Sequence, residues 1–345
     1  MKKLMITSAL VGTLFAGAAS AQTTVSGNLG ISYFSVGNDT ANKANDVGTF
    51  GRESQINISN KGKLNNGFDY VAGFSLEFDG SDSTLTTGAG ITKGVATGQQ
   101  QENVYIDFIS GNTTISVGVD HFQNTDAHYT NLVGFGYIGA DGVNNTASIY
   151  PAANATLYGN WGVGVAQKAA GGQFGLYYTP NATNQAVNDI GNGLTKAATL
   201  DNPSGYELTY VGDAGVKGLS LLAGYARADS PSAGSKIGGQ RIAAKYNLGS
   251  LTLAVDDVTA KVLNTADTDG RSYGVAYAVN KDVSVGVTYA EAKRPGSKDE
   301  ETVLVALGYN LGPVTVQAQH KKANNVGGTA ANDGEITGIY LGTRF

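Results

Sequence analysis

Histidine beside aspartate is the first feature of the sequence that could support a reaction. Asp120 precedes His121 directly, and one residue separates Asp126 from His128. Such pairs orient a general base in hydrolases, but that chemistry also needs a nucleophile within hydrogen-bond reach. The third histidine, His320, has no serine near it in the sequence. We therefore interpret the histidines as loop or interfacial residues and predict that the chain is not an enzyme. A hydrolase remains an alternative, and it would depend on His121 or His128.

Two short motifs could hold a metal ion or a phosphate. Residues 267–270 (DTDG) resemble the opening of a calcium loop, but the third spaced ligand and the closing glutamate are missing. Residues 162–164 (GVG) lie inside an alternating segment, where glycine suits a strand better than a phosphate cradle. We predict no metal and no cofactor.

The composition excludes several classes of protein. Of 345 residues, 41% are hydrophobic, only 15% are charged, 49 are glycine and none is cysteine. The absence of cysteine excludes a disulfide scaffold and a thiolate metal site. No repeated apolar runs of about 20 residues are present, which argues against a helical membrane protein. The formal net charge of −5 argues against nucleic acid as a partner, because phosphate binding needs a basic surface.

The N-terminus has the organisation of a secretory signal peptide. Lys2 and Lys3 precede an apolar stretch, which ends in the small residues 19–21 (ASA). We predict cleavage between Ala21 and Gln22, so residues 1–21 are a signal and residues 22–345 form a single mature domain.

The mature chain alternates between apolar and small polar residues. In the first example Val25, Leu29, Ile31 and Tyr33 share one parity, and serine, asparagine and glycine occupy the other. This period of two predicts strands with one apolar face. Sixteen such segments occur, at residues 24–35, 52–61, 68–79, 102–110, 113–120, 155–167, 173–179, 205–213, 218–228, 239–248, 250–258, 271–279, 282–291, 301–311, 313–321 and 335–345.

The connections between these segments alternate between short and long. Short ones such as 110–112 and 248–250 contain glycine and other turn residues, whereas 36–51, 80–101 and 121–154 are long and polar. This arrangement favours an all-β fold, a closed antiparallel transmembrane β-barrel of about sixteen strands with short periplasmic turns and long extracellular loops. A soluble β-sandwich also alternates, but its polar face would carry more charge.

Several segments resemble the Gram-negative general porins of the sixteen-stranded branch. They are residues 24–30 (TVSGNLG), 52–56 (RESQI), 103–106 (NVYI), 117–119 (VGV) and the last strand, 339–345 (IYLGTRF). The resemblance implies a homotrimer in the outer membrane of a Gram-negative bacterium, with the third loop, residues 121–154, folded into each pore. It also implies lipid, lipopolysaccharide and the barrel-assembly machinery as partners, the last through the terminal Phe345.

The proposed function of such a barrel depends on the charges inside it. Parity and loop position select the following candidates for the pore lumen and constriction: Glu77, Asp107, Asp120, Asp126, Asp141, Glu207, Arg241, Lys245, Asp256 and Arg344. Acids outnumber bases, so we expect passive diffusion of small hydrophilic solutes and ions with a weak preference for cations. A substrate-specific channel, or a barrel adhesin or receptor with little conductance, remains an alternative.

Overall fold

The computed structural model describes most of the chain from Gln22 onward. The described residues are 22–38, 47–81, 85–86, 92–93, 100–119, 129–130, 132–133, 161–180, 204–229, 236–261, 267–330 and 333–345. The predicted signal peptide, residues 1–21, lies outside them. Within these ranges no helix has the length and apolar character needed to cross a membrane.

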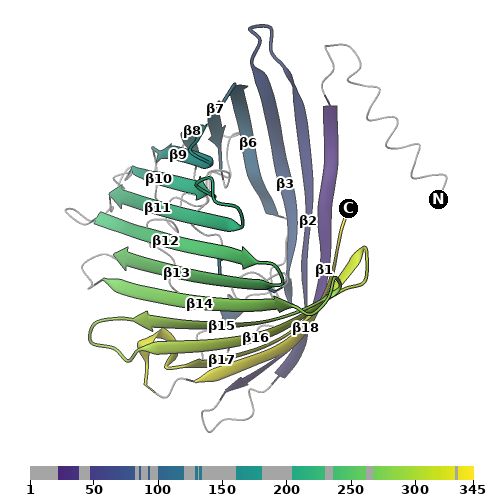
Figure 1. The fold of residues 1–345 in the computed structure, drawn as a ribbon, viewed down its shortest axis with the longest axis vertical. Helices are drawn as coiled ribbons and strands as arrows, with labels where there is room; N and C mark the ends of the chain where they lie inside the picture. Colours follow the sequence, from purple (N-terminus) through teal and green to yellow (C-terminus); the bar gives the residue numbers. More distant parts are fainter. Residues whose placement is uncertain are drawn as a thin grey trace, which may run out of the picture.

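Sixteen antiparallel strands close a barrel, and Figure 1 shows how they follow one another around it. They are β1 (Gln22–Asn38), β2 (Val47–Lys63), β3 (Asp69–Ser81), β6 (Gln100–Ser110), β7 (Thr113–Gly118), β8 (Gly162–Ala169), β9 (Gly172–Thr179), β10 (Gly205–Gly212), β11 (Leu219–Asp229), β12 (Lys236–Leu248), β13 (Leu251–Lys261), β14 (Thr268–Ala278), β15 (Val283–Lys293), β16 (Glu300–Asn310), β17 (Val314–Asn324) and β18 (Gly334–Arg344). The number of strands and the fold class predicted from the sequence are confirmed.

The first and last strands close the barrel by pairing with each other. β18 runs antiparallel to β1, with Arg344 opposite Asn28. Beyond the end of β18, Phe345 and Gly27 exchange two backbone hydrogen bonds, of 2.9 and 3.0 Å. The pairing leaves no open sheet edge, as hydrocarbon surroundings require, because an edge would expose unpaired N–H and C=O groups.

The strands present two different faces. In β16, Val303, Val305 and Leu307 are between 43% and 49% exposed, whereas the alternate residues Thr302, Leu304 and Ala306 are buried. The same alternation holds in β14 and β18. The exposed apolar parity therefore points outward, and the parity of small and polar residues points into the barrel.

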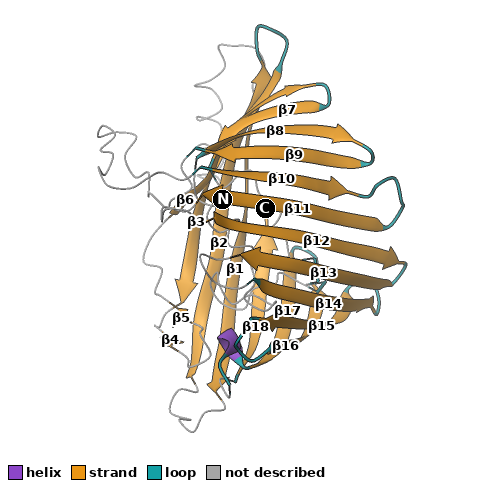
Figure 2. Ribbon diagram, turned by 90° about the vertical axis from the view of Figure 1, so that its left-hand side faces the viewer, coloured by secondary structure: helices purple, strands orange, loops and turns teal. Residues whose placement is uncertain are grey.

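The short turns lie along one rim of the barrel, on the right-hand side of Figure 2. Gly171, between β8 and β9, and Gly249, between β12 and β13, adopt positive φ angles of 70° and 66°. These angles suit glycine and explain why the tight turns contain it.

Most strand ends lie within about three residues of the predicted bounds, and three regions differ more clearly. β1 and β2 each extend to 17 residues, so strand residues occupy part of the expected loop at 36–51. The short strands β4 (Leu85–Thr86) and β5 (Thr92–Lys93) pair with each other within the expected loop at 80–101. β8 begins at Gly162 rather than at 155, and residues 155–160 lie outside the described part. A short 3-10 helix, η2 (Val326–Gly328), follows β17.

Candidate pore and constriction site

A short segment between β7 and β8 lies against the inner wall of the barrel. Thr130 is fully buried there, 142 residues before its partner Ser272 on β14, and their hydroxyl oxygens are 2.9 Å apart. The backbone oxygen of Thr130 also accepts a hydrogen bond of 2.7 Å from the hydroxyl of Thr288 on β15. This part of the third loop is thus attached to two neighbouring strands by hydrogen bonds.

Three residues further along, Val133 occupies an apolar socket in the same wall. Val133 is 2% exposed and packs with Ala276 of β14 and Ala306 of β16, with Leu132 partly buried against the cluster. The backbone oxygen of Val133 accepts a hydrogen bond of 3.1 Å from the side-chain amide of Gln317 on β17. The segment therefore crosses the inner face from β14 to β17.

Three inward glycines make this close contact possible. A Cβ atom at Gly274 would collide with the backbone oxygen of Thr130. At Gly286 and Gly308, a Cβ would lie 2.6 and 3.1 Å from the two methyl groups of Val133. These distances are too short for ordinary packing, so any larger residue at 274 or 286 must push the loop segment away from the wall.

Tyr129 attaches the other end of the segment to β11 and β12. Its hydroxyl donates a hydrogen bond of 3.2 Å to the backbone oxygen of Leu221, and the ammonium group of Lys245 lies 5.9 Å from the centre of its ring. Burial raises the pKa of the Tyr129 phenol above its ordinary value of 10. The ammonium group over the ring forms a cation–π contact.

Arg241 and Asp256 form a buried ion pair on the wall beside Tyr129. Arg241 on β12 donates through Nε to Asp256 Oδ1 on β13 at 2.8 Å, and through Nη2 to Oδ2. Both side chains are 6% exposed. The two-point contact satisfies both charges at once. The sequence selected both residues as separate lumen charges, and the structure brings them together.

The other selected wall residues are more widely spread. Glu207 on β10 is 1% exposed and faces inward between Tyr206 and Leu208, which face outward. Glu77 on β3 and Asp107 on β6 are half-buried, and Asp107 accepts a hydrogen bond of 2.5 Å from Ser116 of β7. Arg344 lies exposed at the end of β18. Asp120, at the end of the predicted strand 113–120, and Asp126 and Asp141 of the third loop lie outside the described residues.

The sequence analysis missed a second inward charge cluster, near the η2 end of the barrel. Glu300, at the start of β16, is 2% exposed and accepts a hydrogen bond of 3.1 Å from Arg294 Nη1. Lys321 on β17 lies near enough to Glu300 for their charges to interact. Lys321 shares the parity of Gln317 and Gln319, which is the signal that could have found it. Glu300 was counted as part of a loop.

No metal site is seen in the part of the chain that the structure describes, and His121 and His128 lie outside that part. Within the described residues, no cluster of three or more His, Asp or Glu residues could hold a metal ion. His320 lies on the outward face, where its Nδ1 is 2.7 Å from the hydroxyl of Thr337. The Asp267 to Gly270 motif leads into β14, where Asp269 Oδ1 accepts a hydrogen bond from Thr259.

A closed barrel of sixteen antiparallel strands, with an apolar outer face, a polar inner face and a loop segment on its inner wall, defines a transmembrane β-barrel channel. The family model of the Gram-negative porins matches residues 7–342, and the chain belongs to this family. It is an outer-membrane porin channel of a Gram-negative bacterium.

Solved structures support the fold. A triple mutant of the Rhodopseudomonas blastica porin is similar to this chain with a TM-score of 0.63 at 13% identity, covering 94% of this chain and 100% of that one. A porin refined at 1.8 Å resolution gives a TM-score of 0.61 at 13% identity over 94% and 100%. Vibrio cholerae OmpT lacking loop L8 gives 0.62 at 14% identity over 94% and 99%. No curated protein matches the sequence.

Proposed function

We propose that this porin is a passive diffusion channel for small hydrophilic solutes and ions, without enzymatic activity, and that it works as a homotrimer. The observation that carries the proposal is the attachment of Thr130 and Val133 to the inner wall of β14 to β17. A sixteen-stranded barrel is wide enough for an aqueous bore, and a loop fixed inside it sets the aperture. Lipopolysaccharide and the barrel-assembly machinery are the partners that we expect for such a chain.

We further propose a weak preference for cations. Among the inward charges, Arg241 is paired with Asp256, and Lys321 lies beside Glu300. The half-buried wall of β3 and β6 adds the acids Glu77 and Asp107, so inward acids outnumber inward bases among these residues. Fixed carboxylates that face water attract cations and raise their local concentration. In this proposal Glu77 and Asp107 act as lumen charges, and the buried pair has a structural role.

Recording in a planar lipid bilayer tests the function directly. A trimeric diffusion channel predicts insertion in triple steps, ohmic current and a reversal potential of cationic sign under a salt gradient. A clear anion preference would refute the charge argument. Block of the current that saturates with one solute would favour a substrate-specific channel, and silence would favour an adhesin or receptor.

The absence of native cysteine offers a clean test of the loop position. Introducing T130C together with S272C places two thiols where hydroxyl oxygens now lie 2.9 Å apart. We expect the disulfide to form readily and the open-channel conductance to be the same under oxidising and reducing conditions. T130C alone is the control for the substitution itself. A conductance that changes when the disulfide is reduced would show that the conducting state needs the segment to leave the wall.

A further inference from the structure

The charged residues of the barrel are distributed unevenly between its two ends. We call the short-turn mouth the residues that lie in the short turns, within three residues of them or next to the terminal Phe345. In the described part of the chain its bases are Lys61, Lys63, Lys168, Lys217, Lys281 and Arg344, and its acids are Asp69, Asp213 and Asp282. Six bases against three acids give this mouth a positive formal charge.

The acids of the short-turn mouth are each engaged locally. Asp69 Oδ1 lies 3.1 Å from the ammonium nitrogen of Lys63. Asp282 Oδ2 lies 3.8 Å from that of Lys281. Asp213 Oδ1 accepts a hydrogen bond of 2.8 Å from the backbone N–H of its own turn, at residue 215. These carboxylates therefore do not offset the other bases of the mouth.

Those other bases face the water of the bore. Lys61 has the inward parity of Asn57 on β2, and Lys168 has that of the buried Ala166 on β8. Arg344 ends the inward parity of β18. All three basic side chains are exposed. Positive charge is thus present at the short-turn mouth on β2, β8 and β18.

The rest of the predicted mature chain is acidic. Of the 23 bases and 28 acids, two bases lie in the predicted signal and six bases and three acids lie in the short-turn mouth, which leaves 15 bases and 25 acids elsewhere. In the half of the inner wall nearer the long loops, Glu77, Glu207 and Glu300 are inward acids, and the base Lys321 lies beside Glu300. The two ends of the bore therefore carry opposite formal charges.

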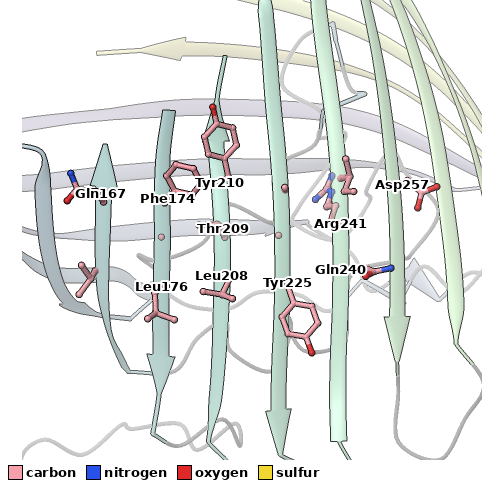
Figure 3. A pocket seen from close by; sticks show the side chains of 15 residues that line it. Gln167, Phe174, Leu176, Leu208, Thr209, Tyr210, Tyr225, Gln240, Arg241 and Asp257 are labelled. Atoms are coloured by element: carbon pink, nitrogen blue, oxygen red, sulfur yellow. The ribbon is translucent and has the colours of Figure 1, made fainter. Parts of the chain in front are cut away.

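The wall between the bore and the lipid keeps these charges effective. Outward side chains on neighbouring strands, such as Phe174, Leu208 and Tyr225, are aromatic or aliphatic (Figure 3). A low-dielectric wall of this kind focuses the field of the inner charges into the water of the bore, where counter-ions gather.

The height of the barrel keeps the two ends electrically separate. An 11-residue strand that rises about 3.3 Å per residue and is tilted by about 40° is roughly 28 Å tall. The Debye length at 0.1 M salt is only about 10 Å. The charges at one end therefore do not neutralise those at the other.

We propose that the pore rectifies its current at low salt, and that it conducts better when the long-loop side is positive. The inference rests on the proposed diffusion channel. At this polarity cations enter through the acidic half and anions enter through the basic mouth, so each ion enters where it is already enriched. At the opposite polarity each ion must enter past charges that repel it, and the bore is depleted of carriers.

Current recording from single channels of known orientation tests the proposal. The chain has no cysteine, so N65C, in the exposed turn between β2 and β3, can be biotinylated and used as the reference channel. Streptavidin is too large to pass the pore. Added to one chamber after the recording, it changes the current only when the tagged turns face that chamber.

The salt concentration separates rectification from simple diffusion. In 0.1 M potassium chloride we expect at least about 1.5-fold more current with the long-loop side positive than at the opposite voltage of equal size. In 1 M potassium chloride, where the Debye length is about 3 Å, the ratio should approach one and the current should be ohmic.

Charge removal at the short-turn mouth locates the cause. In the N65C background, K61Q/K168Q/K217Q removes three exposed bases and should bring the current ratio in 0.1 M salt close to one. An unchanged ratio in this variant would overturn the assignment to these bases.

The matched control removes three bases near the other end. K293Q/K298Q/K322Q takes away the same number of exposed positive charges and should keep or increase the ratio. An equal loss in both triple variants would overturn the proposal. So would a symmetric current in the reference channel at 0.1 M salt, or a larger current at the opposite polarity, and both results leave the diffusion channel standing. Silence of the reference channel would overturn both.

Discussion

Two inner walls of this porin differ in what covers them. The inward residues of β14 to β17 that contact the loop segment are small or amide-bearing and almost fully buried, as Ala276, Thr288 and Gln317 show at 7%, 4% and 1% exposure. The inward residues of β2, β3 and β6, among them Asn57, Glu77 and Asp107, are half-buried. We call the first the loop-bearing wall, which we take to include the adjoining β12 and β13, and the second the open wall. Small inward residues on neighbouring strands leave room for another backbone, whereas longer polar ones fill that space themselves.

The largest loss of stability should come from breaking the ion pair at the edge of the loop-bearing wall. R241L leaves Asp256 buried without its two-point partner, and breaking such a pair costs about 3–5 kcal/mol. Urea unfolding in detergent measures the loss of stability, with the folded fraction read from the compact band on a gel. The double variant R241L/D256L should recover most of it, since no uncompensated charge then remains. Equal stability of R241L and the unaltered protein would contradict a buried, interdependent pair.

The next effect tests the glycine contacts. G286L forces Val133 away from the wall, because a Cβ alone would lie 2.6 Å from its methyl group. We expect a loss of stability of about 1–3 kcal/mol from overpacking. The displaced segment moves toward the barrel axis, so the single-channel conductance should fall and the current noise should rise. N57L places added bulk on the open wall as a control. An equal change of noise in both variants would remove the distinction between the walls.

A smaller effect should follow from loosening the hydrogen bonds to the loop. T288V removes the donor to the backbone oxygen of Thr130, and Q317L removes the donor to that of Val133. Each loss should cost about 1 kcal/mol. Current fluctuations at fixed voltage should increase in each single variant and more in the double variant. Fluctuations in the double variant that match the unaltered channel would show that the Val133 socket alone holds the segment.

The smallest change in stability and conductance should come from removing a charge on the open wall. D107N keeps the size of the side chain and removes a charge that accepts a hydrogen bond from Ser116. Because Asp107 is half-buried, we expect a stability change within about 0.5 kcal/mol. The reversal potential under a salt gradient should shift slightly away from cation preference. S116A is the control, since it removes the hydrogen bond and keeps the charge. A shift in S116A as large as in D107N would assign the effect to geometry rather than charge.

The strands could be predicted from the sequence because residues that face lipid and residues that face the barrel interior alternate along each strand. Alternation in segments such as 271–279 needs only local residues, and it placed β14 within a few positions of its observed bounds. The register between neighbouring strands could not be predicted from the sequence. Arg241 and Asp256 look like two independent lumen charges until β12 and β13 are aligned, because the pairing depends on backbone hydrogen bonds and not on local composition.

The loop contacts were hidden for a similar reason. Gly274, Gly286 and Gly308 suit a water-lined wall as well as a wall that receives a loop, so their types alone do not distinguish the two. Only the arrival of Thr130 and Val133 from more than a hundred residues away gives them a role. Glu300 was overlooked because it lies at a strand boundary, where alternation is weakest.

The pairing of β1 with β18 sets an order of events for the cell. The earliest strand to be synthesised must wait with one side unsatisfied until the final eleven-residue strand has been made. The barrel therefore cannot close before β18 has been made. A chain that lacks β18 would leave one edge of β1 unpaired, and such an edge is not tolerated in lipid.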